Sequence, residues 1–244
     1  MSLMRPHVPL LLLLHVVFTP PTNGDDFVFG SGCFWGRQHS FVQLEEQQWQ
    51  RTPSEITTIG IYFGGNSPNN TLACYYNAHD QYVYSEEGHA EAVVLDIPTL
   101  DHLPAALAVY WQSFDNASGT FMREDYFDVG PGYRALLGFQ GGVHNKTIMN
   151  VLNTNNPHNA TFREALGSDA DTLGLNFIWI YDTSTVSKAS KLLYPYHQTE
   201  LCLQFHNNQT GKYSKDYHAL KRTLLQQGRL KDTDCPMPEI DSCL

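Results

Sequence analysis

The sequence predicts an α+β fold, a two-layer sandwich of helices on a mixed, largely antiparallel sheet. The chain has 244 residues, of which 42% are hydrophobic, enough to bury one substantial core. Short runs with period-two alternation are interspersed with longer helical patterns, and the connections between them differ in length. Because the strand runs are short and the loops unequal, a doubly wound parallel sheet is the lesser alternative.

The first half of the chain predicts a strand, a helix, two strands and a second helix. In that order they are expected at 25–32, 34–49, 56–65, 88–97 and 100–114. Alternation of Ile59, Ile61 and Phe63 before a double glycine indicates the second strand. The second half predicts a strand, a loop over 153–171, a second strand and then two helices. The strands are expected at 133–139 and 175–182, and the helices over 186–198 and 213–228.

The N-terminus is typical of a secretory signal peptide. Arg5 precedes an apolar run at 8–18 that is too short to span a bilayer, and prolines and small residues follow it. A buried element that opens the domain is the alternative. Five Asn-x-Ser/Thr sequons could carry glycans only in the secretory route: Asn69, Asn116, Asn145, Asn159 and Asn208. We therefore expect a signal peptide over 1–24, a domain over 25–228, a flexible tail over 229–244, and a glycoprotein that is secreted or retained in the secretory lumen.

Charge and cysteine spacing exclude several classes of protein. A net charge of −10 with only 15 Lys and Arg argues against binding to nucleic acid or to an anionic membrane. The five cysteines show no CxxC pair and no Cys/His cluster at zinc spacing, so no metal site is expected. An odd count in an oxidising compartment leaves at least one thiol without an intramolecular partner.

The stretch GSGCFWG places Cys33 at a junction from a strand to a helix. The positive end of the helix dipole would favour the thiolate and lower the pKa of Cys33. The flanking glycines keep access open, and Phe34 and Trp35 could form an apolar wall beside the sulfur. The alternative is an inert buried cysteine whose aromatic neighbours belong to the core.

Acidic and phenolic side chains elsewhere could complete a site. Glu91 shares a strand face with Val93 and Leu95, so its carboxyl is expected to point inward, where desolvation raises its pKa and makes it a proton donor. A Glu91 that reaches solvent is the alternative. The stretch DVGPGYR brings Asp128 and Tyr133 to the mouth of the strand 133–139, although by itself it is a turn.

The segments GCFWG, GHAEAVV and DVGPGYR, in this order, resemble the class A peptide methionine sulfoxide reductases, which act on the S-epimer. The resemblance covers about Phe27 to Phe139, and YFGGNSPNNT and YHQTEL resemble further family segments. It implies a ferredoxin-like core and no metal or organic cofactor. It also implies reduction of methionine sulfoxide in proteins, in peptides or as the free amino acid.

The resemblance assigns roles to the same residues. Cys33 would attack the sulfoxide sulfur, Glu91 would protonate the oxygen, and Asp128 and Tyr133 would hold that oxygen, Asp128 directly or through water. Phe34 and Trp35 would form the pocket for the methionine methyl group. Cys33 would be left as a sulfenic acid, which condenses with a thiol to a disulfide that an external reductant, thioredoxin-like or a small thiol, reopens.

The chain departs from the family at three places, one of which is Gly132, where the family has a glutamine before the tyrosine. Leu72 stands where the family has a second tyrosine, and four tyrosines could substitute for it: Tyr75, Tyr76, Tyr82 and Tyr84. The family's recycling cysteine after YHQTEL is absent, so we expect Cys235 or Cys243 of the tail to resolve oxidised Cys33. Alternatively, these two bridge each other and leave Cys33 to an external thiol. Cys74 and Cys202 have the least apparent connection to turnover.

Two other functions remain open at this point. A secreted homologue could keep the fold and the pocket for a binding or structural role without turnover, because an oxidising compartment opposes reduction. A cysteine hydrolase ranks low, since no motif positions a histidine beside Cys33.

Overall fold

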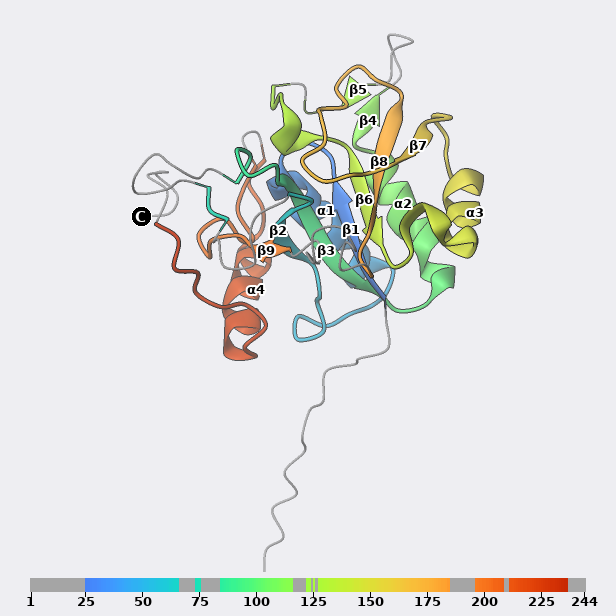
Figure 1. The fold of residues 1–244 in the computed structure, drawn as a ribbon. Helices are drawn as coiled ribbons and strands as arrows, with labels where there is room; N and C mark the ends of the chain where they lie inside the picture. Colours follow the sequence, from blue (N-terminus) through green and yellow to red (C-terminus); the bar gives the residue numbers. More distant parts are fainter. Residues whose placement is uncertain are drawn as a thin grey trace, which may run out of the picture.

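The computed structural model describes residues 25–65, 73–75, 84–115, 122–123, 125, 127–184, 196–208 and 211–236. Its main element is a seven-stranded sheet in the order β7-β8-β6-β1-β3-β2-β9 (Figure 1). The strands are β1 (Asp25–Gly30), β2 (Ile59–Phe63), β3 (Ala90–Ile97), β6 (Leu136–Phe139), β7 (Thr161–Glu164), β8 (Phe177–Asp182) and β9 (His197–Gln198). A separate two-stranded sheet pairs β4 (Phe114–Asp115) with β5 (Met122–Arg123).

The main sheet is mixed. The pairs β1–β3, β1–β6, β2–β3 and β2–β9 are antiparallel, whereas β6–β8 and β7–β8 are parallel. β3 lies between β1 and β2, with Tyr62 of β2 opposite Glu91 of β3. Glu91 therefore lies on an interior strand of the sheet.

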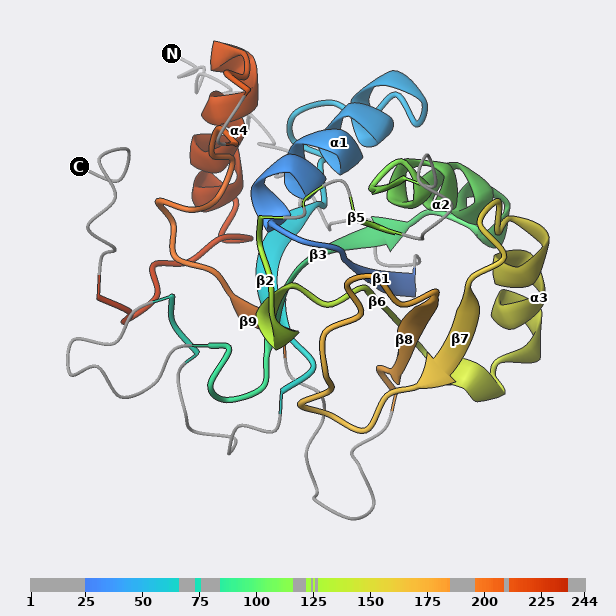
Figure 2. The same cartoon turned by 90° about the horizontal axis from the view of Figure 1, so that it is seen from above.

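The helices are α1 (Phe34–Gln47), α2 (Leu103–Trp111), α3 (Lys146–Thr154) and α4 (Lys215–Gln226), with 3-10 turns η1 (Leu100–His102), η2 (Pro131–Tyr133) and η3 (Gly142–His144). Figure 2 shows the four helices on the same side of the sheet, with α4 beside α1. Apolar residues of α1, α2 and α3 form one core cluster with the strand face that carries Phe29, Val93 and Leu95. A second cluster joins α4 to α1 through Val42, Tyr217 and neighbours.

Local sequence explains where the helices begin. Asn145 and Ser214 stand at the N-caps of α3 and α4, where their side chains accept hydrogen bonds from Ile148 N and Tyr217 N. Cys33 is the N-cap of α1 and has extended backbone angles, so the chain leaves β1 and enters the helix within three residues, 31–33.

The α+β class and the mixed sheet are confirmed, whereas the ferredoxin-like two-layer detail stays a prediction. The loop expected over 153–171 contains β7, an exposed edge strand without hydrophobic alternation. The end of the helix expected over 186–198 is wrong, because 197–198 form β9. Residues 186–195 of that expected helix lie outside the described residues. In the part of the chain that the structure describes, no helix is long and apolar enough to span a membrane.

Candidate active site

Cys33 lies at the N-terminus of α1 with its backbone bonded to an acidic side chain. Its N–H donates to Asp125 Oδ2 at 2.8 Å. Gly32 has a φ of +70°, and a Cβ at this position would lie 2.8 Å from both Cβ and Oδ2 of Asp125. The glycine is therefore needed both for the turn and for the approach of Asp125.

Glu91 is buried beside Cys33. Its Oε2 accepts a hydrogen bond from Phe34 N at 3.0 Å, and its Oε1 accepts one from the Tyr84 hydroxyl at 3.0 Å. The Cys33 thiol and this carboxyl group lie close enough to affect each other's pKa. Desolvation raises the pKa of Glu91 to about 8, so the carboxyl carries a proton at neutral pH.

Tyr84 supplies a second phenol next to Glu91. Its ring stacks on Tyr62 with 4.4 Å between centroids, and its phenol and that of Tyr133 affect each other's pKa. Tyr84 is thus the tyrosine, among the four sequence candidates, that the structure brings to Glu91. The Tyr75 ring stacks on the Tyr84 ring with 5.9 Å between centroids, and the Tyr75 N–H donates to Glu200, while Tyr76 and Tyr82 lie outside the described residues.

Asp128 belongs to a pair of carboxyl groups. Desolvation together with the nearby charge of Asp125 raises the pKa of Asp128 to about 6. Asp128 also raises the pKa of Cys33, Glu91 and Tyr133 through its charge, which places it among these groups. Sequence reasoning missed Asp125, because an acidic residue in a short irregular segment carries no motif.

The loop that bears both aspartates is fixed by a buried arginine. Arg123 Nη1 forms an ion pair with Asp171 at 2.6 Å, and its Nη2 donates to the backbone oxygen of Asp128 at 2.7 Å. Asp171 also accepts the N–H of Gly130 at 2.7 Å. These contacts hold the segment 128–130 in one place relative to Arg123.

Arg134 ties together the segments that carry Glu91 and Tyr133. Its fully buried guanidinium donates to the carbonyl oxygens of Pro131, Gly64 and Gly88 at 2.7, 3.1 and 2.9 Å. Its Nε donates to the hydroxyl of Tyr181, which in turn donates to Asp169. One side chain therefore joins the start of β3, the turn η2 and the end of β2.

The pKa of Cys33 differs from the sequence expectation. Desolvation and the charges of Glu91, Asp128 and Asp125 raise this pKa well above 9.0, against the lowering that the helix N-terminus was expected to produce. The helix end is outweighed because the same turn gathers several carboxyl groups around the thiol. Cys33 is therefore a thiol, not a thiolate, at neutral pH before substrate binds.

The two aromatic residues after Cys33 lie in different surroundings. Phe34 is 1% exposed and packs edge-on against Tyr62, so it belongs to the core beneath the site. Trp35 is half-buried and its ring lies 4.2 Å from that of His206. Of the two, Trp35 offers a surface that a substrate can reach.

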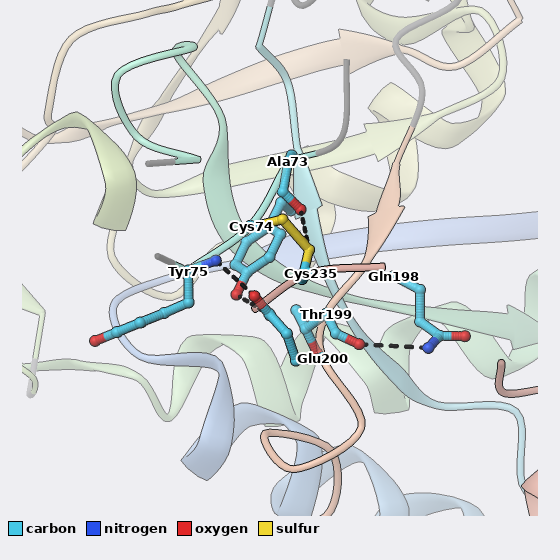
Figure 3. The surroundings of a disulfide bond; sticks show 8 residues. Ala73, Cys74, Tyr75, Gln198, Thr199, Glu200 and Cys235 are labelled. Carbon is cyan, nitrogen blue, oxygen red and sulfur yellow. Dashed lines mark hydrogen bonds between the residues drawn. A yellow bond between two sulfur atoms is a disulfide. The ribbon is translucent and has the colours of Figure 1, made fainter. Parts of the chain in front are cut away.

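Cys74 and Cys235 form a disulfide, shown in Figure 3. The alternative in which Cys235 bridges Cys243 is therefore wrong. Cys202 is also disulfide-bonded, and among the described residues Cys33 is the free cysteine. The resolving role of Cys235 stays a prediction and requires its release from Cys74, while Cys243 lies outside the described residues.

The disulfide lies next to Glu200. Glu200 accepts hydrogen bonds from Tyr75 N at 2.7 Å and from the Tyr62 hydroxyl at 2.8 Å (Figure 3 shows the first). Although a ligand atom of each of Cys74, Cys235 and Glu200 lies within 4.8 Å of the others, the two sulfurs are bonded to each other. Leu230, at the described start of the tail, is buried in the cluster that joins α4 to α1.

Comparison with known proteins gives relatives of one kind. Peptide methionine sulfoxide reductase MsrA of Methylococcus capsulatus is 36% identical over 110 residues, which are 45% of this chain and 41% of the relative. The MsrA of Rhodospirillum centenum is 34% identical over 119 residues, 48% of this chain and 46% of the relative. The MsrA of Escherichia coli O6:H1 is 29% identical over 124 residues, 50% of each chain.

This chain is a relative of peptide methionine sulfoxide reductase MsrA. The resemblance seen in the motifs is thus confirmed, and the chain spans about half the length of the curated relatives it matches. No protein-family model matches the chain. Among solved structures, methionine sulfoxide reductase A of Corynebacterium diphtheriae aligns with 91% of this chain and 84% of its own at 15% identity, with a TM-score of 0.43, too low to carry an argument.

Proposed function

We propose that this protein reduces the S-epimer of methionine sulfoxide, free or in peptides and proteins, with Cys33 as nucleophile. The observation that carries the proposal is the contact of the Cys33 thiol with a buried Glu91 whose pKa is raised to about 8. Oxygen transfer from a sulfoxide needs a proton donor and a nucleophile, and a protonated carboxyl next to a thiol supplies both. The relatedness to the MsrA proteins supports the same reaction.

The chemistry follows from the arrangement of these side chains. Glu91 delivers its proton to the sulfoxide oxygen as Cys33 Sγ bonds to the sulfur, and then takes up the proton that Cys33 loses. The phenols of Tyr84 and Tyr133 donate hydrogen bonds to that oxygen, and Trp35 lies beside the methyl group. The sulfoxide's sulfur–oxygen bond and the transient bond between its sulfur and Cys33 Sγ then break as the hydroxyl group bonds to Cys33 Sγ. Methionine leaves with its sulfur reduced by two electrons, and Cys33 is oxidised by two electrons to a sulfenic acid.

Recycling of Cys33 is the least constrained step of the proposal. Because Cys74 is bonded to Cys235 and Cys202 is bonded as well, an external thiol is the simplest reductant for the sulfenic acid at Cys33. A thioredoxin-like protein or a small thiol fits this step. The signal peptide over 1–24, the domain over 25–228, the tail over 229–244, secretion, glycosylation and the ferredoxin-like core remain parts of the proposal that rest on the sequence.

A coupled assay tests the activity. The purified protein with dithiothreitol should convert the S-epimer of a methionine sulfoxide peptide to methionine and leave the R-epimer unchanged. Cys33→Ser should abolish the conversion while near-ultraviolet circular dichroism stays the same. If neither epimer is converted, the proposed reductase activity is contradicted and a binding or structural homologue is favoured.

The fate of Cys33 is tested without thiol. After one equivalent of sulfoxide, we expect dimedone to label Cys33 as the sulfenic acid in peptide mapping. A crosslink from Cys33 to Cys235 or Cys243 would instead establish the resolving role expected from the sequence.

A further inference from the structure

We propose that the bridge between Cys74 and Cys235 is a site of thiol–disulfide exchange, at which a dithiol attacks Cys235 and Glu200 protonates the leaving sulfur of Cys74. This inference goes beyond the proposed function, because it concerns a sulfur pair distinct from Cys33 and does not depend on reduction of methionine sulfoxide. Glu200 is a buried ionisable group that the reaction at Cys33 does not use.

Glu200 is buried without a cation to balance its charge. The residue is 2% exposed, and the ion pairs formed by the described residues do not include it. Each of its two oxygens accepts one hydrogen bond, from Tyr75 N at 2.7 Å and from the Tyr62 hydroxyl at 2.8 Å. Because a buried carboxylate is costly, desolvation favours the protonated carboxyl group and raises the pKa of Glu200.

The carboxyl group lies beside both sulfurs of the bridge. One of its oxygens and the two Sγ atoms all lie within 4.8 Å of one another, and Figure 3 shows the carboxyl next to the bridge. A rotation of the carboxyl or one bridging water spans a gap of this size. Because Glu200 is bonded to the N–H of Tyr75, the residue after Cys74, it stays beside Cys74 when Cys235 moves away.

The two sulfurs differ in their access to solvent. Cys74 is 5% exposed, whereas Cys235 is half-buried and follows the exposed Asp234. A thiol that arrives from solvent therefore attacks Cys235 Sγ, and Cys74 Sγ is the leaving group. Desolvation penalises a thiolate released at a buried position, so a proton from Glu200 lowers the cost of opening the bridge.

The exchange balances with a dithiol as reductant. Its thiolate bonds to Cys235 Sγ as the bond between the two cysteines breaks, and Cys74 Sγ keeps the electron pair and takes the proton of Glu200. The second thiolate of the reductant then displaces Cys235 Sγ, which takes a proton from water and can donate to Ala73 O, 3.6 Å away. The bridge gains two electrons and two protons, the dithiol becomes a cyclic disulfide, and Glu200 recovers its proton from water.

The groups that face Glu200 are neutral or acidic. Tyr62 of β2 and Tyr75 donate to it, and Glu91 of β3 lies beyond Tyr62, since both carboxyl groups raise the pKa of that phenol. Asp234 lies at the exposed end of the bridge, next to Cys235. Among these neighbours no cation opposes protonation of Glu200.

The experiment measures how fast the bridge opens. The full protein is mixed with dithiothreitol at about pH 5 to 9, samples are quenched with excess N-ethylmaleimide, and alkylated Cys74 and Cys235 are quantified by peptide mapping. Division by the concentration of dithiothreitol thiolate removes the pH dependence of the attacking group. In the unmodified protein, we expect this rate constant to fall as the pH rises and Glu200 ionises.

Glu200→Gln separates proton transfer from a structural role. Its amide oxygen accepts the N–H of Tyr75 and its amide nitrogen donates to the Tyr62 hydroxyl, but it has no acidic proton to transfer. We expect its rate constant to be about 10²-fold lower than that of the unmodified protein at pH 5 and to vary little with pH. If Glu200 only fastens the segment 73–75 to β2, the two profiles coincide or the variant opens faster at every pH, and either result overturns the inference.

Asp234→Asn is the matched control, because it removes a negative charge next to the attacked sulfur without removing the proton donor. Its rate constant should rise by the same factor at every pH, since the attacking thiolate is repelled less. A profile that flattens in this variant as in Glu200→Gln would assign the pH dependence to surface charge and overturn the inference.

A monothiol identifies the attacked sulfur. With N-acetylcysteine in place of dithiothreitol, we expect the mixed disulfide on Cys235 and the alkylated thiol on Cys74. The reverse distribution contradicts the assigned direction of attack.

Tyr62→Phe decides the question if Glu200→Gln does not fold. It removes a hydrogen bond that lowers the pKa of Glu200, so the fall of the rate constant should move to higher pH. A fall that stays at the same pH overturns the inference. None of these measurements depends on methionine formation, so failure of this inference and failure of the proposed function are distinguished.

Discussion

The hydroxyl of Tyr84 donates to Glu91 Oε1 at 3.0 Å, from a segment seven residues before Glu91 in the chain. This bond favours the ionised form of Glu91 and so lowers a pKa that burial raises. It also places a phenol at the carboxyl that handles the proton.

Tyr84→Phe removes this bond without changing the ring. We expect the pKa of Glu91 to rise, which moves the alkaline fall of the single-turnover rate to higher pH, and the rate itself to drop about tenfold through loss of a donor. Tyr110→Phe is the matched control, because Tyr110 is also fully buried but donates to Gly30 O at 3.3 Å. If the alkaline fall of the single-turnover rate stays at the same pH in Tyr84→Phe, a group other than Glu91 is the proton donor.

Glu91→Gln should slow the chemical step by about 10² to 10⁴ at neutral pH, with a much smaller change in substrate binding, because only the transition state needs the proton.

The same variant has a consequence for stability. The folded-state pKa of about 8 lies above the ordinary pKa of 4.5, so the carboxyl stabilises the folded chain below pH 4.5 and this contribution is lost as pH rises toward 8.

Urea unfolding measures that second effect. The free energy of unfolding of the unmodified protein should decline between pH 4.5 and 8 more steeply than that of Glu91→Gln. Glu86→Gln, at an exposed position five residues earlier, should follow the unmodified protein. Parallel curves for all three proteins would show that Glu91 ionises at its ordinary pKa.

Iodoacetamide should alkylate Cys33 slowly. A pKa well above 9.0 leaves less thiolate at pH 7 than in a free cysteine, and each pKa unit lowers the thiolate fraction about tenfold. Because Asp125 contributes to the raised pKa, Asp125→Asn should be alkylated faster than the unmodified protein. N-acetylcysteine is the reference. If Cys33 is alkylated faster than this reference, the pKa of Cys33 is lowered, as the helix N-terminus predicts, and the raised pKa is contradicted.

Replacement of both Cys74 and Cys235 by alanine should destabilise the chain. The bridge closes a loop with a sequence separation of 161 residues, for which the loss is about 3 to 5 kcal/mol. Activity should fall as well, since the carbonyl oxygen of Cys74 accepts the N–H of Tyr84 at 2.9 Å. Unfolding in urea measures the loss of stability, and the unmodified protein reduced with a phosphine serves as the comparison. A midpoint unchanged in both samples would show that the bridge does not constrain the fold.

The sequence predicted the site where it had motifs or periodicity. Glu91 was found from the alternation of the strand that carries it, and that strand, β3, is buried at Glu91, Val93 and Leu95. Cys33 was found from its place between a strand and a helix. Both positions follow from local patterns, which the backbone geometry of strands and helices imposes on neighbouring residues.

The parts that were not predicted depend on contacts between distant segments. Asp125 reaches Cys33 across 92 positions of the chain, and its segment has no periodicity that would point to it. The high pKa of Cys33 follows from carboxyl groups on other elements, whereas the helix-dipole argument used only its own element. The strand β7 was missed because its side chains are mostly exposed, so pairing with β8 and not alternation defines it.

The bridge between Cys74 and Cys235 limits the reductants with which such an enzyme could work. A thiol strong enough to regenerate Cys33 must still leave this second sulfur pair oxidised, since the pair anchors Tyr84 through Cys74. The protein would then operate only within an interval of ambient redox potential: too oxidising, and Cys33 is not regenerated; too reducing, and the scaffold beside Glu91 loosens. Its repair activity would report on the redox balance of its surroundings as well as depend on it.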